Sequence, residues 1–269
     1  MALLLLIQFV YENKTAKVLG AVMDKVLYVA MTGARENMLA QQVHANNLAN
    51  ATTTGFKADL EQARAMRVIG EGVPSRVYSM SERPATNTES GTLIQTGRPL
   101  DVAVQGNDWV AVRASDGSER YTRGGELSLD ANGQLLLPNG TPVLGNGGAP
   151  VIIPPAEQIT IANDGSITIR PLGSAADELA VVDQIKMVAA EPGQLWKGDD
   201  GFMRTDDLVP LPTSQNSQLR SGYIESSNVN AVAELTSMIS LSRQFEMQVK
   251  IMSSADENAQ IASKILQMS

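Results

Sequence analysis

Apolar residues recur every three or four positions near both ends of the 269-residue chain, whereas the middle alternates in shorter runs. Spacings of three and four place side chains on one face of a helix, and a spacing of two places them on one face of a strand. The pattern predicts a helix near each terminus and strands between them. We expect an α+β fold in which the N- and C-terminal helices pair as a coiled-coil domain and a central all-β domain is inserted between them.

The first helix is expected within residues 23–56. Its apolar stripe is narrow, because few neighbouring positions are apolar, and Gln41 interrupts it. The stripe consists of Leu27, Met31, Ala34, Met38, Gln41, Ala45 and Leu48. We predict that these residues form one side of a seam between helices.

The second helix is expected from about Val229 to Gln267, within a C-terminal segment of residues 208–269. Asn228 is a candidate N-cap, since its side chain can accept a hydrogen bond from an early backbone N–H. A helix of this length spans roughly 57 Å at 1.5 Å per residue. Its stripe comprises Met238, Leu241, Phe245, Met252, Ala255, Ala259, Ala262 and Leu266, with Gln248 in one slot.

Both stripes are narrow and repeat about every seven residues, which favours coiled-coil packing over the wide apolar face of a globular core. Ordinary core packing within one chain is the alternative. We expect the helices to pair and to share their seam with neighbouring subunits.

The middle of the chain, residues 98–207, has the pattern of a β-rich domain. Asp-Gly and Asn-Gly pairs between short apolar runs are strong hairpin signals, and they occur at Gly117, Gly133, Gly140 and Gly165. Ile159–Ile161 and Ile167–Ile169 alternate on either side of one such turn. Residues 57–97 are polar and interrupted by proline and glycine, so we expect an extended connector there.

Three asparagines lie within five positions at the end of the first helix: Asn46, Asn47 and Asn50. Asparagine is unfavourable inside a helix because its amide competes for backbone hydrogen bonds. These amides could instead bond a neighbouring helix, or they could mark a frayed helix end. The run continues to Gly55, Phe56 and Lys57.

Candidate chemistry is sparse. The sequence has no phosphate-binding loop, zinc-protease motif or nucleophile elbow. The single histidine, His44, falls on the first helix without a nucleophile nearby, and the pairs Asp199–Asp200 and Asp206–Asp207 fall in glycine-containing turns. Asp130 begins a run like a calcium loop but lacks its closing glutamate. We predict no catalytic residue, no cofactor and no metal site.

A net charge of −8 argues against nucleic acid or an anionic membrane as the main partner. The absence of cysteine excludes disulfides and thiolate metal sites. Residues 1–22 contain an apolar run that is too short to span a membrane and unlike a cleavable signal. We expect them to be a non-native or mis-started extension before Met23, and we expect no membrane insertion.

Four blocks of sequence resemble successive blocks of the flagellar rod and hook proteins, in the same order. They are residues 46–57, 98–106, 121–133 and 221–230. Within that family the chain is most similar to proximal-rod members, because Gly106 is followed by Asn107-Asp108-Trp109 and because residues 58–63 lack an aromatic acidic stretch.

This resemblance implies a structural subunit of the bacterial flagellar basal body. It implies export through the flagellar type III apparatus without signal cleavage, and assembly in the periplasm with copies of itself, earlier proximal-rod proteins and the distal-rod protein. The terminal helices would line the export channel of a hollow drive shaft. A distal-rod or hook-type subunit, or a β-domain that binds a ligand, are the alternatives.

The expected assembly interface contains residues from both helices and from residues 46–57, which we call the asparagine-rich corner. They are Leu27, Met31, Met38, Asn46, Asn47, Leu48, Asn50, Gly55, Phe56, Asn228, Met238, Leu241, Phe245, Met252 and Leu266. A free subunit cannot bury both stripes, so we expect the helices to become ordered when neighbours supply the missing surface.

Overall fold

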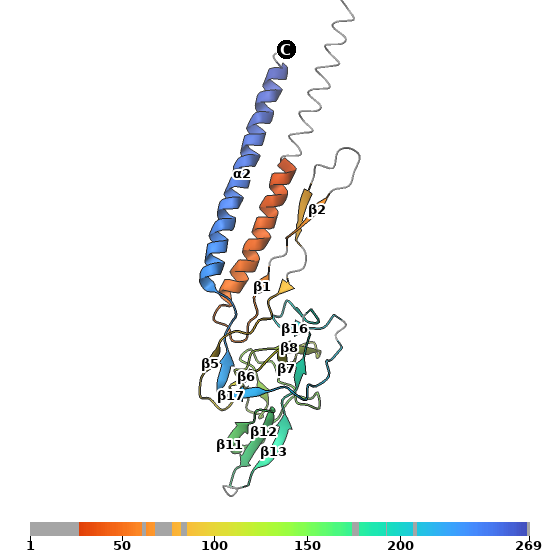
Figure 1. Cartoon of the computed structure of the whole chain (residues 1–269), viewed down its shortest axis with the longest axis vertical. Helices are drawn as coiled ribbons and strands as arrows, with labels where there is room; N and C mark the ends of the chain where they lie inside the picture. Colours follow the sequence, from red (N-terminus) through yellow and green to blue (C-terminus); the bar gives the residue numbers. More distant parts are fainter. Residues whose placement is uncertain are drawn as a thin grey trace, which may run out of the picture. The chain divides into compact units, whose positions relative to one another are not determined.

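The chain divides into two compact units in the computed structural model (Figure 1). The structure describes residues 27–60, 63–67, 77–81, 85–173, 178–191, 193–206 and 209–267. Unit 1 consists of Met1–Asn46, Glu61–Pro84 and Val232–Ser269, and unit 2 consists of Asn47–Leu60 and Ala85–Ala231. The extension predicted for residues 1–22 lies outside the described residues.

Unit 1 contains the two terminal helices. Residues 27–49 are helical, and helix α2 (Ala231–Gln267) lies beside them (Figure 1). The helices are antiparallel, because Gly33 lies close to Gln248 whereas His44 contacts Glu234. Strands β2 (Ala63–Arg67) and β3 (Val77–Ser81) form an antiparallel hairpin in the same unit. The predicted α+β class with two terminal helices is confirmed.

The buried face of the N-terminal helix differs from the predicted stripe. Leu27, Met31 and Met38 are 42, 55 and 56% exposed, so the helix pair of one chain does not bury them. The buried positions are Ala30, Ala34, Asn37 and Ala40. Small side chains let two helix backbones approach closely, and the larger apolar side chains remain outside the contact.

The predicted stripe of α2 is confirmed as its less exposed side. Met238, Leu241, Phe245 and Met252 are half-buried, and the residues between them are largely exposed. The side chain of Leu266 lies outside the described part of the chain. The helix begins at Ala231, with Asn230 preceding it, so the predicted N-cap at Asn228 is wrong.

Unit 2 is built around a five-stranded antiparallel sheet in the order β14-β7-β8-β16-β15. Its strands are β14 (Met187–Ala189), β7 (Asp108–Arg113), β8 (Glu119–Thr122), β16 (Met203–Arg204) and β15 (Trp196–Lys197). Val110 and Val112 of β7 belong to one buried cluster, and Trp109 and Ala111 belong to another. Alternate side chains point to opposite faces of a strand, so this strand is covered on both faces.

A second sheet of three strands has the order β11-β12-β13, formed by β11 (Ala156–Ile161), β12 (Ser166–Pro171) and β13 (Ala180–Gln184). Ile159 pairs with Ile169 and Ile161 with Ile167, which confirms the hairpin predicted from their alternation. Gly165 closes the turn with a φ of 84°, a conformation that glycine adopts without strain.

Four short antiparallel pairs complete unit 2. They are β1 (Asp59–Leu60) with β4 (Ala85–Thr86), β5 (Leu93–Gln95) with β18 (Tyr223–Glu225), β6 (Val102–Val104) with β17 (Leu219–Ser221), and β9 (Ser128–Leu129) with β10 (Leu135–Leu136). The unit therefore includes residues on both sides of the range 98–207 expected from sequence.

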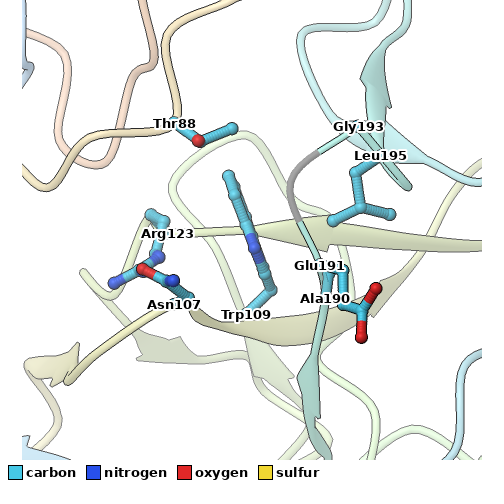
Figure 2. A pocket seen from close by; sticks show the side chains of 8 residues that line it. All are labelled: Thr88, Asn107, Trp109, Arg123, Ala190, Glu191, Gly193 and Leu195. Carbon is cyan, nitrogen blue, oxygen red and sulfur yellow. The ribbon is translucent and has the colours of Figure 1, made fainter.

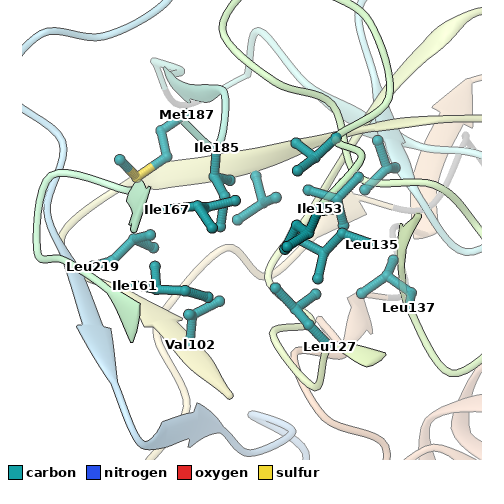
Figure 3. Packing of buried hydrophobic residues seen from close by; sticks show 14 of the residues in the cluster. Val102, Leu127, Leu135, Leu137, Ile153, Ile161, Ile167, Ile185, Met187 and Leu219 are labelled. Atoms are coloured by element: carbon teal, nitrogen blue, oxygen red, sulfur yellow. The ribbon is translucent and has the colours of Figure 1, made fainter. Parts of the chain in front are cut away.

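The larger buried cluster of unit 2 is aliphatic and joins the two sheets with the short strand pairs (Figure 3). Ile161, Ile167 and Leu219 lie on one side of it, and Leu127, Leu135 and Ile153 on the other. All are at most 2% exposed. Burial of these side chains provides the main favourable free energy of folding for this unit.

Candidate functional site

Gly55 fixes the turn that follows the N-terminal helix. Its φ is 70°, in the left-handed region that favours glycine. A Cβ atom at this position would lie 2.2 Å from the backbone carbon of Arg123, so only glycine fits. The N–H of Gly55 donates a 2.8 Å hydrogen bond to the backbone oxygen of Glu225. The turn therefore brings residues from three distant parts of the sequence together.

Lys57 and Glu225 form an ion pair in the interior of unit 2. Lys57 Nζ lies 2.6 Å from Glu225 Oε1 and also donates to the backbone oxygen of Glu89 at 2.7 Å. Lys57 is 3% exposed and Glu225 is fully buried. The N–H of Gly91 donates to the same Oε1 at 2.8 Å.

Arg123 binds the second carboxylate oxygen of Glu225. Its Nη1 lies 3.1 Å from Glu225 Oε2 and 3.1 Å from the backbone oxygen of Val104. Its Nη2 donates to the backbone oxygen of Gly106. The guanidinium carbon lies 5.3 Å from the centre of the Trp109 ring, and Figure 2 shows the two side chains next to each other. Arginine suits such a site because it can donate several hydrogen bonds in fixed directions.

Burial shifts the protonation equilibria of both cations. It lowers the pKa of Lys57 below its usual value, because charge is costly in a low-dielectric interior, while the bond to Glu225 opposes this shift. The pKa of Arg123 is lowered for the same reason, again against the attraction of Glu225. The carboxylate thus compensates part of the cost of burying these two cations.

The asparagine-rich corner is split between different roles. Asn47 is 1% exposed, and its side chain donates to the backbone oxygen of Asp59 and accepts from the N–H of Asp59, each at 2.9 Å. Asn50 accepts a hydrogen bond from Thr53 Oγ1, whereas Asn46 is exposed. Asn47 therefore bonds its own chain rather than a neighbouring helix.

Phe56 and Asp59 both contact Lys197 from strand β15. Lys197 Nζ lies 3.6 Å from the centre of the Phe56 ring and 3.0 Å from Asp59 Oδ2. It also donates to the backbone oxygen of Lys57 at 2.9 Å. A cation over an aromatic ring is favourable, and more so when partly buried. Phe56 is thereby fixed within its own subunit.

Asn228 binds the connector rather than the helix. Its Oδ1 accepts from the N–H of Ala58 at 2.8 Å, and its Nδ2 donates to the backbone oxygens of Asn87 and Glu89. An amide with both donors and an acceptor can satisfy three backbone groups at once. Asn228 therefore joins three chain segments of unit 2.

The remaining predicted interface residues lie on the helices. Leu48 is half-buried in unit 2, and Met238, Leu241, Phe245 and Met252 are half-buried in unit 1. His44 Nδ1 contacts Glu234 Oε2, so the single histidine takes part in the helix pair.

Chemical sites are sparse in the described part of the chain. It contains no group of three potential metal ligands and no helix that is long and apolar enough to cross a membrane. Asp200 accepts from the N–H of Phe202 and pairs with Arg120, and Asp130 accepts from Gln134, so these acids stabilise turns. A small pocket beside Trp109 is lined by Thr88, Asn107, Trp109, Arg123, Ala190, Glu191, Gly193 and Leu195 (Figure 2).

Comparisons with known proteins agree with the sequence blocks. Three family models match: "Flagella basal body rod protein" at residues 27–57, "Flagellar hook protein FlgE/F/G D1 domain" at 103–169, and "Flagellar basal body rod FlgEFG protein C-terminal" at 220–265. The chain is 41% identical to the flagellar basal-body rod protein FlgF of Escherichia coli, covering 92% of this chain and all of the relative. The chain belongs to the flagellar basal-body rod protein family.

Other relatives in the rod family are the FlgF protein of Salmonella typhimurium, at 39% identity over 92% of this chain and 100% of the relative, and the FlgG protein of Agrobacterium fabrum, at 33% over 90% and 99%. All three relatives are named as flagellar basal-body rod proteins. The chain is accordingly a structural subunit of the flagellar basal-body rod.

The four rod-family blocks meet at the buried charge cluster. Block 46–57 provides Lys57, block 121–133 provides Arg123 and block 221–230 provides Glu225, while block 98–106 provides the carbonyls that Arg123 binds. Lys57, Arg123 and Glu225 all belong to these blocks, but the sequence did not indicate that their charges pair. The available signal was that each block contains at least one charged residue.

Proposed function

We propose that this chain is a subunit of the proximal rod, assembled in the periplasm into a hollow shaft that transmits motor torque and surrounds the export channel. The observation that carries the proposal is the similarity to FlgF proteins along nearly the whole chain. These two FlgF proteins, at 41 and 39% identity, exceed the 33% of the FlgG relative, which supports the proximal over the distal type. Transit through the flagellar type III export apparatus, without signal cleavage, follows from the same assignment.

The exposed apolar side chains of the helices support assembly through them. Soluble monomers rarely leave many large apolar side chains exposed on one element. Those of α2 include Leu235, Ile239, Met247, Val249, Ile251, Ile261 and Ile265, and those of the N-terminal helix include Leu27, Met31 and Met38. We propose that neighbouring subunits cover these side chains and that the assembled helices pack as a coiled coil.

In this arrangement the exposed residues of the stripe predicted for the N-terminal helix contact a neighbouring subunit. Met31 and Met38 are more than half exposed while the alanines of their own helix are buried, so they are available to a second subunit. Methionine is flexible and polarisable and adapts to several neighbours. The partners are copies of this chain, the earlier proximal-rod proteins and the distal-rod protein; no catalytic step, cofactor or nucleic acid takes part.

The test is to locate the subunit in isolated basal bodies. A strain that lacks this chain should be non-motile and should stop rod assembly before the distal-rod protein is added. An epitope-tagged copy should restore motility and should label the rod on the cytoplasmic side of the distal segment. Label in the distal segment would support the distal-rod alternative, and a motile deletion strain would refute a structural role in the rod.

A further inference from the structure

The chain passes between the two units at four points, after Asn46, Leu60, Pro84 and Ala231. The segments of unit 2 next to these points are residues 47–60, 85–95 and 219–231. We call them the crossing segments. Any force that travels along the covalent chain between the helices and unit 2 must pass through a crossing segment.

One carboxylate binds all three crossing segments. Glu225 belongs to the third, its Oε1 accepts from Lys57 of the first, and the same oxygen accepts from the N–H of Gly91 of the second. Its Oε2 accepts from Arg123, which follows β8 of the five-stranded sheet. Arg123 is in turn held by the backbone oxygens of Val104 and Gly106. The crossing segments are therefore attached to the body of unit 2 through Glu225.

Other contacts between the crossing segments reinforce this arrangement. The N–H of Gly55 donates to the backbone oxygen of Glu225, and the N–H of Asn228 donates to that of Phe56 at 3.3 Å. The N–H of Ser226 donates to the oxygen of Thr92 at 2.9 Å. All of these bonds lie inside one chain, so no neighbouring subunit is needed to form them.

We propose that Glu225, with Lys57 and Arg123, forms a joint that fixes the crossing segments in the free subunit, before assembly, and that transmits force between the helices and unit 2 in the rod. The second part rests on the proposed function. In this view Gly55, Phe56, Lys57 and Asn228 determine the geometry inside each subunit, and contacts between subunits are left to the helices. Glu225 acts as a positioning residue.

The experiment compares two glutamates of unit 2 that form ion pairs with lysines. Glu225→Gln is isosteric, but one end of the amide is a donor and both ends face donors, so at least one link of the joint is lost together with the charge. Glu119→Gln is the matched control. Glu119 Oε2 lies 2.8 Å from Lys186 Nζ, in an ion pair whose side chains are 8 and 9% exposed and that contains no residue of a crossing segment.

Hydrogen exchange of the full-length chain, followed by mass spectrometry of peptides, separates the two roles. In Glu225→Gln, residues 52–60, 88–93 and 222–230 should exchange faster together, by about tenfold or more, the factor expected for a lost hydrogen bond to a charged group. Peptides from β11 and β12 should keep their protection. Glu119→Gln should leave the crossing segments protected. Faster exchange confined to residues 222–230, or equal effects of the two variants, would overturn the joint.

A conservative variant covers the case in which Glu225→Gln does not fold. Glu225→Asp keeps the buried charge but is one methylene shorter, so it cannot hold its bonds to Lys57 and Arg123 at the same time. We expect a near-normal melting temperature with faster exchange in residues 52–60 or in the peptide containing Val104 and Gly106. Wild-type exchange in both regions would refute the proposal.

Force transmission is tested in cells by raising the viscosity of the medium, which increases the load on the motor. Cells with Glu225→Asp should export the subunit and form basal bodies, but their swimming should fail at a lower viscosity than that of cells with Glu119→Gln. Equal load dependence would refute the mechanical part of the proposal. A deletion strain that swims normally would refute the rod function itself and leave the exchange result intact.

Discussion

Gly55 lies so close to Arg123 that a Cβ atom at residue 55 would approach the backbone carbon of Arg123 to 2.2 Å. The two residues are far apart in the sequence and belong to different rod-family blocks. Their contact allows the N–H of Gly55 to reach the backbone oxygen of Glu225. The glycine is thus required both by its positive φ and by its neighbour.

Gly55→Ala should destabilise unit 2 by roughly 2 kcal/mol or more, because a left-handed alanine costs about 1–2 kcal/mol before any clash is counted. Urea unfolding followed by the fluorescence of Trp109 and Trp196 measures this loss. Gly117→Ala is the control: its φ is 83° and a Cβ atom there would meet nothing within 4 Å. Equal losses for the two variants would show that the contact with Arg123 is unimportant.

Asn47→Asp should destabilise unit 2 by about 1–3 kcal/mol. Aspartate can still accept from the N–H of Asp59, but it cannot donate to the backbone oxygen of Asp59, which is left unsatisfied beside a buried charge. Thermal unfolding of the full chain measures the effect. Asn258→Asp makes the same change at an exposed helical position, where a change within about 0.5 kcal/mol is expected. Similar losses at both positions would contradict the assignment.

Tyr121→Phe should alter the pH dependence of stability. Burial raises the pKa of Tyr121 above its usual value, and its hydroxyl oxygen accepts from the N–H of Leu211 at 2.7 Å. Below pH 10 the variant should be less stable by about 1–3 kcal/mol, since that N–H loses its partner. Above about pH 10 the unfolded tyrosine ionises first, so wild-type stability falls and the difference between the proteins narrows by up to about 1.4 kcal/mol per pH unit.

Urea unfolding at several pH values from about 8 to 11 tests this expectation. Only the difference between the two proteins matters, because other groups titrate equally in both. A difference that stays constant over this range would show that Tyr121 ionises normally in the folded protein.

Phe245→Asp and Leu48→Asp should abolish motility while the subunit is still synthesised. Both side chains are half-buried. A carboxylate at either position would be unfavourable there, because burying an unpaired charge among apolar side chains is costly. Swimming in soft agar and immunoblots of cell extracts measure the two effects. Ser254→Asp adds the same charge on the exposed side of α2 and should preserve motility. Normal swimming of the Phe245 and Leu48 variants would refute the role of the helical seam.

The elements with strong local signals were predictable from sequence. The Ile159–Ile161 and Ile167–Ile169 strands alternate around an Asp-Gly turn, and their pairing follows from local geometry alone. The half-buried stripe of α2 was also correctly predicted, because Met238, Leu241, Phe245 and Met252 recur at spacings that keep them on one face of a helix.

In the N-terminal helix, the apolar pattern did not show which side chains are buried within the chain. Hydrophobicity ranks Met31 and Met38 above Ala30 and Ala40, but close approach of two helices depends on side-chain volume, and the alanines are buried. The sequence does not state whether a large apolar residue faces its own chain or another copy.

The joint could not be predicted for a different reason. Lys57 and Glu225 are 168 residues apart, and isolated charged residues are normally placed at the surface. Their pairing depends on two chain segments that meet only after unit 2 has folded. The resemblance to the rod family selected the correct residues without indicating what they contact.

Strands β1 and β4 pair with each other through Asp59–Thr86 and Leu60–Ala85, at the two ends of the excursion formed by residues 61–84. Residues 61–84 therefore leave unit 2 and return to it at one place. We expect changes in the length and composition of this segment to leave the register of unit 2 unaltered, because the pairing of β1 with β4 already closes its base. A peptide tag, or the corresponding segment of another rod protein, can therefore be grafted between β1 and β4 to give each subunit type a distinct surface on a common frame.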